Sequence, residues 1–188
     1  MQNIFDNQEL IEVLKSGGII VIPTDTIYGI VCSALDEKSV LRLYEIRKRN
    51  PSKPCIILIS DISEIENFGI SLSDVERKNL LDFFALPKPT SIIIDCEKEE
   101  YQYLHRGTNT LSFRIPKNEN LKNLLKITGP LIAPSANTEG NIPAKNIKEA
   151  KEYFGDQVSL YIDRGEILAN PSKIIKLNKD GSKITIRD

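Results

Sequence analysis

Residues 18–60 read GIIVIPTDTIYGIVCSALDEKSVLRLYEIRKRNPSKPCIILIS and decide both the expected fold and the expected site. The run 19–22 is continuous and β-branched, which is typical of a strand covered on both faces. The polar turn 24–26 (TDT) follows, and Asp36 can then cap a helix. That helix ends in a group of cations, after which 55–59 forms a second apolar strand. A hydroxyl-rich strand end beside a cationic loop indicates a place for a small polar substrate next to a polyanion.

The length and composition of the chain indicate one globular domain over residues 1–188. Of the 188 residues, 40% are hydrophobic and 27% are charged, and both fractions are ordinary for a globular protein. The aromatic fraction is 6% and tryptophan is absent, so Ile, Leu and Val must form most of the core. The net charge of −1 argues against a surface that is basic throughout, although it allows a local basic groove.

Cysteine usage and the first residues of the sequence indicate a cytoplasmic protein. Cys32, Cys55 and Cys96 are odd in number and lie in or beside apolar runs, so we expect buried free thiols in a reducing compartment. The stretch MQNIFDNQEL has neither the basic region nor the apolar run of a secretory signal. No apolar run approaches the roughly 20 residues that span a bilayer, so no membrane partner is expected.

Strands and helices interleave along the chain without alternating strictly. The apolar patterns predict strands at 19–22, 27–32, 55–59, 91–95, 111–115, 131–133, 159–162, 174–177 and 184–187. Besides the helix that Asp36 caps, helices are predicted at 8–16, 74–85, 121–127 and 146–154. The polar segment 96–107 is predicted to be a mobile loop. Together these elements predict an α/β domain with a mixed, twisted sheet.

Four polar clusters sit at the ends of apolar strands, where α/β proteins place their ligands. They are Thr24-Asp25-Thr26 with Tyr28, Arg47-Lys48-Arg49 with Lys53, the strand Thr110-Leu111-Ser112-Phe113-Arg114, and Ser135-Ala136-Asn137 with Gly140. Each also has an ordinary structural explanation, namely a turn, cations at a helix end, an exposed edge strand and a loop. Beneath apolar packing, Arg114 would be costly without an anionic partner.

Motifs of several other function classes are missing from the sequence. It has no GxxxxGK[ST] loop, no GxGxxG, no GxSxG elbow and no metal-binding set of cysteines and histidines. The single histidine, His105, is interpreted as a surface residue rather than a catalytic base. No metal site built from protein ligands alone is assigned, because Asp25 and Asp163 could hold Mg²⁺ only together with substrate phosphates.

Six segments taken together resemble the YrdC/TsaC family of L-threonylcarbamoyladenylate synthases. In order they are GGIIVIPTDTIYGIVCSALD, LYEIRKRNPSKPCIILI, LPKPTSIII, TLSFRIP, APSANTEGNIP and NPSKIIKL, and the similarity covers about residues 8–187. The resemblance implies a YrdC-like fold, which is an open twisted mixed β-sheet with flanking helices and a positively charged concave site. It also implies the short, single-domain bacterial form of the family.

The same resemblance implies an enzyme of the nucleotidyltransferase class. It would make threonylcarbamoyl-AMP and pyrophosphate from L-threonine, bicarbonate and ATP, with Mg²⁺ bound to the ATP. The product would supply the N6-threonylcarbamoyladenosine (t6A37) modification of tRNA. The downstream threonylcarbamoyl-transfer machinery would therefore be a partner of the protein.

The expected site residues are those that match the family motifs. Threonine contacts are expected at Thr26, Tyr28, Arg114 and Ser172. Nucleotide contacts are expected at Arg49, Lys53, Thr110, Ser135, Asn137 and Arg187. The catalytic cations, which would stabilise charge on the reacting phosphates, are expected to be Arg47, Arg49 and Lys53.

The sequence departs from the family pattern at three points and leaves two other functions open. Arg47 stands where the family has lysine, NP at 50–51 shifts a proline by one position, and PKP at 87–89 replaces a PGP turn. Arginine is a planar fork of donors whereas lysine is a compact point charge, so the two are not interchangeable. The alternatives are a YrdC-fold paralogue that binds double-stranded RNA or tRNA, and one with other carbamoyl chemistry.

Overall fold

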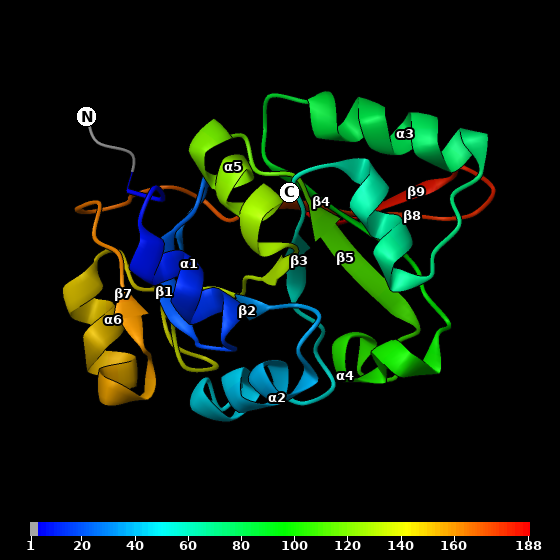
Figure 1. Cartoon of the computed structure of the whole chain (residues 1–188). Coiled ribbons are helices and arrows are strands. Elements are labelled where there is room, and N and C mark those ends of the chain that lie inside the picture. The colour runs from blue at the N-terminus through cyan, green and yellow to red at the C-terminus, as the bar shows by residue number, and fades with distance from the viewer. Residues whose placement is uncertain (1–3) are drawn as a thin grey trace.

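Strand β1 (Ile20–Pro23) lies inside one mixed sheet with all four residues buried. The computed structural model describes residues 4–188, and residues 1–3 of the expected domain lie outside this range. Within it, the sheet has nine strands in the order β7-β1-β2-β6-β3-β5-β4-β8-β9 (Figure 1). The pairs β1/β7, β3/β5 and β4/β8 are parallel and the other pairs are antiparallel. The predicted α/β domain with an open mixed sheet is confirmed.

The predicted strands and helices are all present, with ends shifted by at most two residues, and α4 (Gln102–His105) and the short 3₁₀ helices come in addition. The remaining strands are β2 (Tyr28–Ser33), β3 (Ile56–Leu58), β4 (Thr90–Asp95), β5 (Thr110–Arg114), β6 (Leu131–Ile132), β7 (Leu160–Tyr161), β8 (Lys173–Leu177) and β9 (Lys183–Arg187). The α-helices are α1 (Gln8–Lys15), α2 (Glu37–Ile46), α3 (Asp74–Ala85), α4 (Gln102–His105), α5 (Glu119–Thr128) and α6 (Ile147–Phe154). The 3₁₀ helices are η1 (Ile62–Phe68), η2 (Glu99–Tyr101) and η3 (Gly155–Gln157).

Side-chain caps explain where the predicted helices begin. The Asp36 carboxylate accepts a hydrogen bond from the Lys38 amide at 3.2 Å, which satisfies one of the free donors at the start of α2. Before α3, Ser73 and Glu76 form a reciprocal capping box: the Glu76 amide donates to Ser73 Oγ and the Ser73 amide donates to Glu76 Oε2. Such caps are local, and for this reason the sequence alone predicts them.

Two hydrophobic clusters cover opposite faces of the sheet. Ile20 and Ile22 of β1 belong to a smaller cluster with residues of α1 and α5, which lie side by side in Figure 1. Ile19 and Val21 point the other way, into the larger cluster that includes residues of α2, α3, α4 and α6. Because neighbouring side chains of a strand alternate between faces, the continuous apolar run is buried on both sides.

The segment 96–107 is not the loop that its polarity predicted. It contains η2 and α4, and Leu104 and His105 are 3% and 2% exposed. Tyr101 packs its ring against Phe68, with the centroids 5.4 Å apart. The Tyr103 hydroxyl donates to the Ala34 carbonyl at 3.0 Å. The apolar side chains of this stretch thus anchor it to the larger core, while its three glutamates remain exposed.

The prediction that His105 lies at the surface is wrong. Its imidazole is buried, and its Nδ1 accepts a hydrogen bond from the Gly107 amide at 3.1 Å. Nε2 has no hydrogen-bond partner among residues 4–188. The bond to Gly107 closes the end of α4, so the imidazole has a structural position rather than a solvated one.

The three cysteines are buried free thiols, as their apolar surroundings predicted. Burial raises the pKa of Cys32, Cys55 and Cys96 above the ordinary value, because the thiolate loses its hydration. No helix in the described part of the chain is long and apolar enough to cross a membrane.

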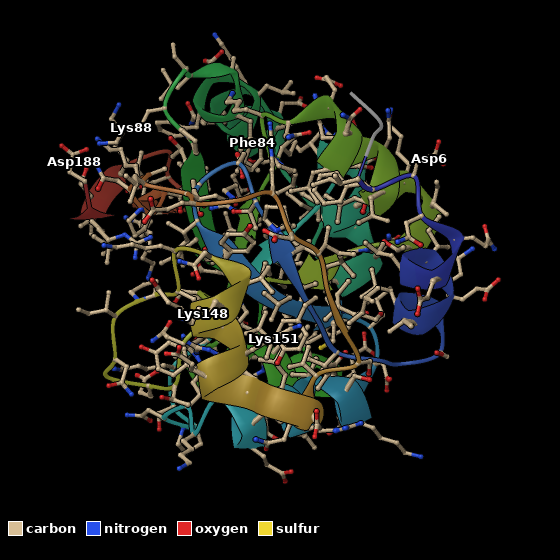
Figure 2. The ribbon with its side chains drawn as sticks, turned by 90° about the vertical axis from the view of Figure 1, so that its left-hand side faces the viewer. Asp6, Phe84, Lys88, Lys148, Lys151 and Asp188 are labelled. Carbon is tan, nitrogen blue, oxygen red and sulfur yellow. The ribbon has the colours of Figure 1, made fainter. Side chains whose placement is uncertain are left out.

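The last strand, β9, forms an outer edge of the sheet beside β8. Asp188 follows it and pairs with Lys88 at 3.2 Å and with Lys173 at 3.1 Å, and Figure 2 shows Lys88 and Asp188 close together. The same view shows Lys148 and Lys151 on the outer side of α6. These exposed ion pairs join the residue after β9 to β8 and to the segment before β4.

Candidate functional site at the strand ends

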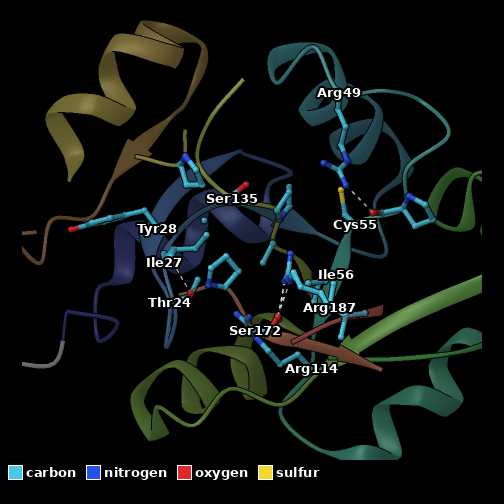
Figure 3. Close-up of a pocket in the computed structure, with 17 residues that line it drawn as sticks. Thr24, Ile27, Tyr28, Arg49, Cys55, Ile56, Arg114, Ser135, Ser172 and Arg187 are labelled. Carbon is cyan, nitrogen blue, oxygen red and sulfur yellow. Dashed lines mark hydrogen bonds between the residues drawn. The ribbon is translucent and has the colours of Figure 1, made fainter. Parts of the chain in front are cut away.

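A cavity of about 290 Å³ opens where the ends of several strands meet (Figure 3). Its walls come from the turn between β1 and β2, the loop before β3, the end of β5, the loop after β6 and the β8/β9 pair. The side chains and backbone that line it include Thr24, Tyr28, Arg49, Ile56, Arg114, Ser135, Ser172 and Arg187. Strand ends from distant parts of the sequence meet here because the sheet order places β3, β5 and β6 together.

One side of the cavity is built around Arg114, the last residue of β5. Its guanidinium forms an ion pair with Asp25 at 3.2 Å, and both side chains are only 4% exposed. Nη1 also donates to Thr26 Oγ1 at 3.2 Å, whereas Nε has no hydrogen-bond partner among the described residues. Burial lowers the pKa of Arg114 from its ordinary value, and the Asp25 charge opposes that effect. Arg114 lines the cavity, so its guanidinium brings positive charge to this side.

Asp25 is the anionic partner that a buried Arg114 requires. Its Oδ2 accepts from the Lys117 amide at 2.9 Å, which fixes the carboxylate. Thr24 Oγ1 donates to the Ile27 carbonyl at 2.7 Å and lies 2.9 Å from Thr26 Oγ1. The TDT turn therefore holds Asp25 and Thr26 toward Arg114. Sequence reasoning did not assign this role to Asp25, although the cost of burying Arg114 alone already pointed to such a partner.

Tyr28 lines the cavity with its ring, while its hydroxyl is engaged elsewhere. The hydroxyl donates to the Gly165 carbonyl at 2.8 Å and accepts from the Arg164 amide at 2.9 Å. Figure 3 shows the hydroxyl directed away from Arg114. Burial raises the pKa of Tyr28, so the phenol stays neutral. The structure thus assigns the hydroxyl of this expected threonine contact to holding the 163–165 segment.

Arg49 enters the cavity because of the way α2 ends. Lys48 has a left-handed backbone with φ of 49°, and the Arg49 amide donates to the Tyr44 carbonyl at 2.9 Å. These are the features of a Schellman motif, which reverses the chain after a helix. The Arg49 guanidinium then donates to the carbonyls of Lys53 at 3.1 Å and Pro54 at 2.9 Å. Its position is therefore set by backbone oxygens.

Arg47 lies behind the cavity rather than in it. It is 1% exposed, and its guanidinium donates to the Ser135 carbonyl at 3.0 Å, to Ser135 Oγ at 3.3 Å and to Asn137 Oδ1 at 3.2 Å. Burial and the nearby Arg49 charge lower the pKa of Arg47 to about 10. Arg47, which the resemblance implies to be a catalytic cation, donates here to the Ser135–Asn137 loop, and a planar fork suits these three acceptors.

The Ser135–Asn137 loop and the β8/β9 pair complete the walls. Ser135 Oγ donates to Asn137 Oδ1 at 2.6 Å, and only Ser135 of the two lines the cavity. Arg187 donates to the Ser172 carbonyl through Nε at 3.0 Å and through Nη2 at 2.7 Å. Burial lowers the pKa of Arg187, and its charge adds to that of Arg114 nearby. The cavity thus presents several donors to anions.

The structure brings most of the expected residues to one site and leaves some at its margin. The cavity is lined by Tyr28, Arg49, Arg114, Ser135, Ser172 and Arg187. Four further expected residues do not line the cavity but contact residues that do, or their neighbours: Thr26, Arg47, Lys53 and Asn137. Thr110 lies at the opposite end of β5 from Arg114, with its hydroxyl 3.0 Å from Thr108 Oγ1.

A family model described as telomere recombination, Sua5/YciO/YrdC, matches residues 12–188. The chain belongs to the Sua5/YciO/YrdC family. Among its relatives, the threonylcarbamoyl-AMP synthase of Stutzerimonas stutzeri is 28% identical over 152 residues, which cover 80% of each chain. The family resemblance that the sequence motifs indicated is confirmed, and relatives in this family are named as enzymes.

Solved structures of other proteins share the fold. The crystal structure of Pyrococcus abyssi Sua5 complexed with L-threonine has a TM-score of 0.84 and 26% identity, and the match covers 100% of this chain. This chain spans 54% of that longer protein. A protein from Methanobacterium thermoautotrophicum, solved in solution, is 31% identical with a TM-score of 0.72, and the match covers 96% of this chain and 85% of that one.

Proposed function

We propose that the protein is an L-threonylcarbamoyladenylate synthase that combines L-threonine, bicarbonate and ATP. The observation that carries the proposal is a single cavity with anion-binding arginines on different sides, Arg114 and Arg49 (Figure 3). A substrate pair with a carboxylate at one side and phosphates at the other suits this distribution of charge. The names of the relatives and the threonine complex of Pyrococcus abyssi Sua5 support it.

On the threonine side, Arg114 would bind the α-carboxylate of the amino acid. Asp25 and Thr26 engage Nη2 and Nη1, while the buried Nε has no partner among residues 4–188. Thr26 and Ser172 would contribute hydroxyls, and the ring of Tyr28 would form an apolar wall. A fixed and partly satisfied guanidinium needs little rearrangement to accept a carboxylate, which favours binding.

On the nucleotide side, Arg49, Lys53 and Arg187 would face the phosphates, with Ser135 beside them. No group of three acidic, cysteine or histidine side chains in the range 4–188 could hold a metal ion by itself. Asp25 is already engaged by Arg114 and the Lys117 amide. Mg²⁺ would therefore enter with ATP as part of the substrate, its ligands coming mainly from phosphate oxygens and water.

The chemistry needs positioning and charge stabilisation rather than a protein nucleophile. The threonine amine takes up bicarbonate as a carbamate, with loss of water, and a carbamate oxygen then attacks the α-phosphorus of ATP. The bond to the β-phosphate breaks, so pyrophosphate leaves and threonylcarbamoyl-AMP remains. All reactants are anions, so the arginines would lower their mutual repulsion and align them. Arg47 would act indirectly, by holding Ser135 and Asn137.

Pyrophosphate release tests the proposal directly. The protein is incubated with ATP, Mg²⁺ and bicarbonate, with and without L-threonine. We expect pyrophosphate release to depend on threonine. Arg49→Ala should slow this release, with a loss of about 2–4 kcal/mol of transition-state stabilisation. Arg42→Ala is the control, because Arg42 is exposed on α2 outside the cavity. Normal turnover in Arg49→Ala would exclude the role assigned to this residue.

The product would feed the t6A37 modification of tRNA through a separate threonylcarbamoyl-transfer activity. The same assay separates this proposal from a paralogue that binds RNA. Binding of tRNA that falls steeply with salt, together with no pyrophosphate release on addition of threonine, would favour the RNA-binding function. Release with another amino acid or carbamoyl acceptor would favour a paralogue with different chemistry.

A further inference from the structure

The cations on the nucleotide side already hold an anion that belongs to the protein itself. Lys53 Nζ lies 2.8 Å from Glu139 Oε1, and Arg49 Nη1 lies 3.3 Å from Glu139 Oε2. Arg47 Nη1 lies 3.9 Å from the same Oε2. One carboxylate thus faces three of the four cations that follow α2, namely Arg47, Arg49 and Lys53.

The backbone of Glu139 is fixed independently of its side chain. Its amide donates to the Arg47 carbonyl at 2.9 Å, which places the residue directly over the end of α2. The side chain itself is 26% exposed, and Lys53 is 60% exposed. The carboxylate can therefore rotate into solvent about its own side-chain torsions while the loop stays in place.

The ion pairs between Glu139 and the cations form in the unliganded protein, but each is weak enough for a stronger anion to replace the carboxylate. The hydrogen bond from Lys53 and the nearby arginine charges lower the pKa of Glu139, so the carboxylate is ionised at neutral pH. Partly exposed ion pairs each contribute only about 0.2–1 kcal/mol, since water and salt screen them. A triphosphate carries more charge than one carboxylate and offers bidentate acceptors to arginine, so it would displace Glu139.

We propose that Glu139 is a built-in competitor for the nucleotide phosphates at Arg49 and Lys53, which ATP must displace in order to bind. The inference rests on the proposed ATP site and adds to it a residue that sets nucleotide affinity. Glu139 neutralises the cations in the unliganded protein and so prevents them from holding other small anions. This competition lowers the affinity for ATP, and it lowers the affinity for smaller anions even more, so the site becomes selective for polyphosphates.

Calorimetric titration with an ATP analogue whose α and β phosphorus atoms are bridged by methylene tests the inference. We expect Glu139→Gln to bind this analogue about three- to tenfold more tightly than the unchanged protein, because one competing state is removed. Glu139→Asp keeps the net charge but is one methylene shorter, so its affinity should fall between the two. Binding of adenosine, which has no phosphate, should stay the same in all three proteins.

Glu45→Gln is the matched control. Glu45 is exposed on α2 two residues before Arg47, so this change alters the net charge equally without touching the Glu139 contacts. Equal tightening in Glu45→Gln would overturn the inference, since a general charge effect would then explain it. Weaker binding in Glu139→Gln with Mg²⁺ present would also overturn it, and would make Glu139 a ligand of the metal–nucleotide complex.

The outcomes also separate this inference from the proposed function. If Glu139→Gln binds the analogue with unchanged affinity and still releases pyrophosphate with threonine, Glu139 is not a competitor of the phosphates. The proposed synthase function would then still stand. Failure of every variant to bind the analogue would overturn both, because the cations would then not serve a nucleotide.

Discussion

Two buried arginines show how the surroundings of a residue decide its use. Arg114 has a buried carboxylate partner, whereas Arg47 donates to a carbonyl, a hydroxyl and an amide oxygen. A guanidinium that leaves water must recover its hydrogen bonds, so both are held firmly. Each guanidinium keeps one buried nitrogen without a hydrogen-bond partner among the described residues, and the two differ in that Arg114 lines the cavity whereas Arg47 does not.

Replacing Asp25 with Asn should destabilise the protein and weaken threonine binding. The change leaves the Arg114 charge buried without its partner, which costs about 3–5 kcal/mol. Urea unfolding would show the loss, and the KM for threonine should rise more than kcat falls. The double variant Asp25→Asn/Arg114→Met should recover part of the stability but not threonine binding. Full stability in Asp25→Asn would contradict the ion pair.

The carboxyl of Glu139 should titrate below its ordinary value of 4.5. A depressed pKa in the folded state adds stability above pH 4.5 that is lost as the pH falls through the folded-state pKa. Lys53→Met should raise this pKa toward the ordinary value, because the Lys53 hydrogen bond is the largest cause of the shift. NMR titration of the carboxyl carbon measures both values. An ordinary pKa in the unchanged protein would show that the pairing does not form in solution.

At the scale of elements, the end of α2 controls the nucleotide side. Its Schellman turn needs a left-handed residue, and Lys48 adopts φ of 49° there. The turn carries Arg49 inward and leaves Lys53 at the surface, so a backbone feature decides which cation lines the cavity. Side-chain caps such as that of Asp36 are local, which is why the sequence predicted where α2 begins, but it did not predict this left-handed turn at its end.

Changes at Lys48 should therefore alter stability through the backbone alone. Lys48→Gly should stabilise the protein by about 1 kcal/mol, because glycine adopts the left-handed conformation without the penalty of a Cβ atom. Lys48→Val should destabilise it by about 1–2 kcal/mol and weaken nucleotide binding as Arg49 moves. Both have lost the same charge, so each serves as the other's control in urea unfolding. Equal stability of the two variants would contradict the role of the turn.

At the scale of the whole molecule, the site exists because one sheet collects distant segments. Arg114 ends β5, Arg187 ends β9 and Ser135 follows β6, and the order of strands brings these positions together. The walls of the cavity come from several strands and loops, and no single element could form the cavity by itself. Ligands that fill it should consequently stabilise the entire fold.

Thermal unfolding tests this coupling. A ligand at 100 times its Kd adds about 2.7 kcal/mol, which corresponds to a rise in Tm of roughly 5–10 °C for a chain of this length. We expect such a rise with threonine and the ATP analogue together. Arg187→Met should abolish most of it, whereas Lys183→Met, an exposed change on the same strand, should not. If the Tm of Arg187→Met rises as much as that of the unchanged protein, Arg187 and β9 do not contribute to the ligand site.

The sequence by itself determined the strands, the helix caps and the clusters of polar residues at strand ends. These depend on periodicity and on contacts between near neighbours, which the order of residues contains. Only the tertiary structure decided that Arg47 is buried behind the cavity, that Asp25 pairs with Arg114, that His105 is internal and that Glu139 covers the cations. Each of these depends on which distant segments the sheet brings together, and therefore on burial and charge pairing across the fold rather than along the chain.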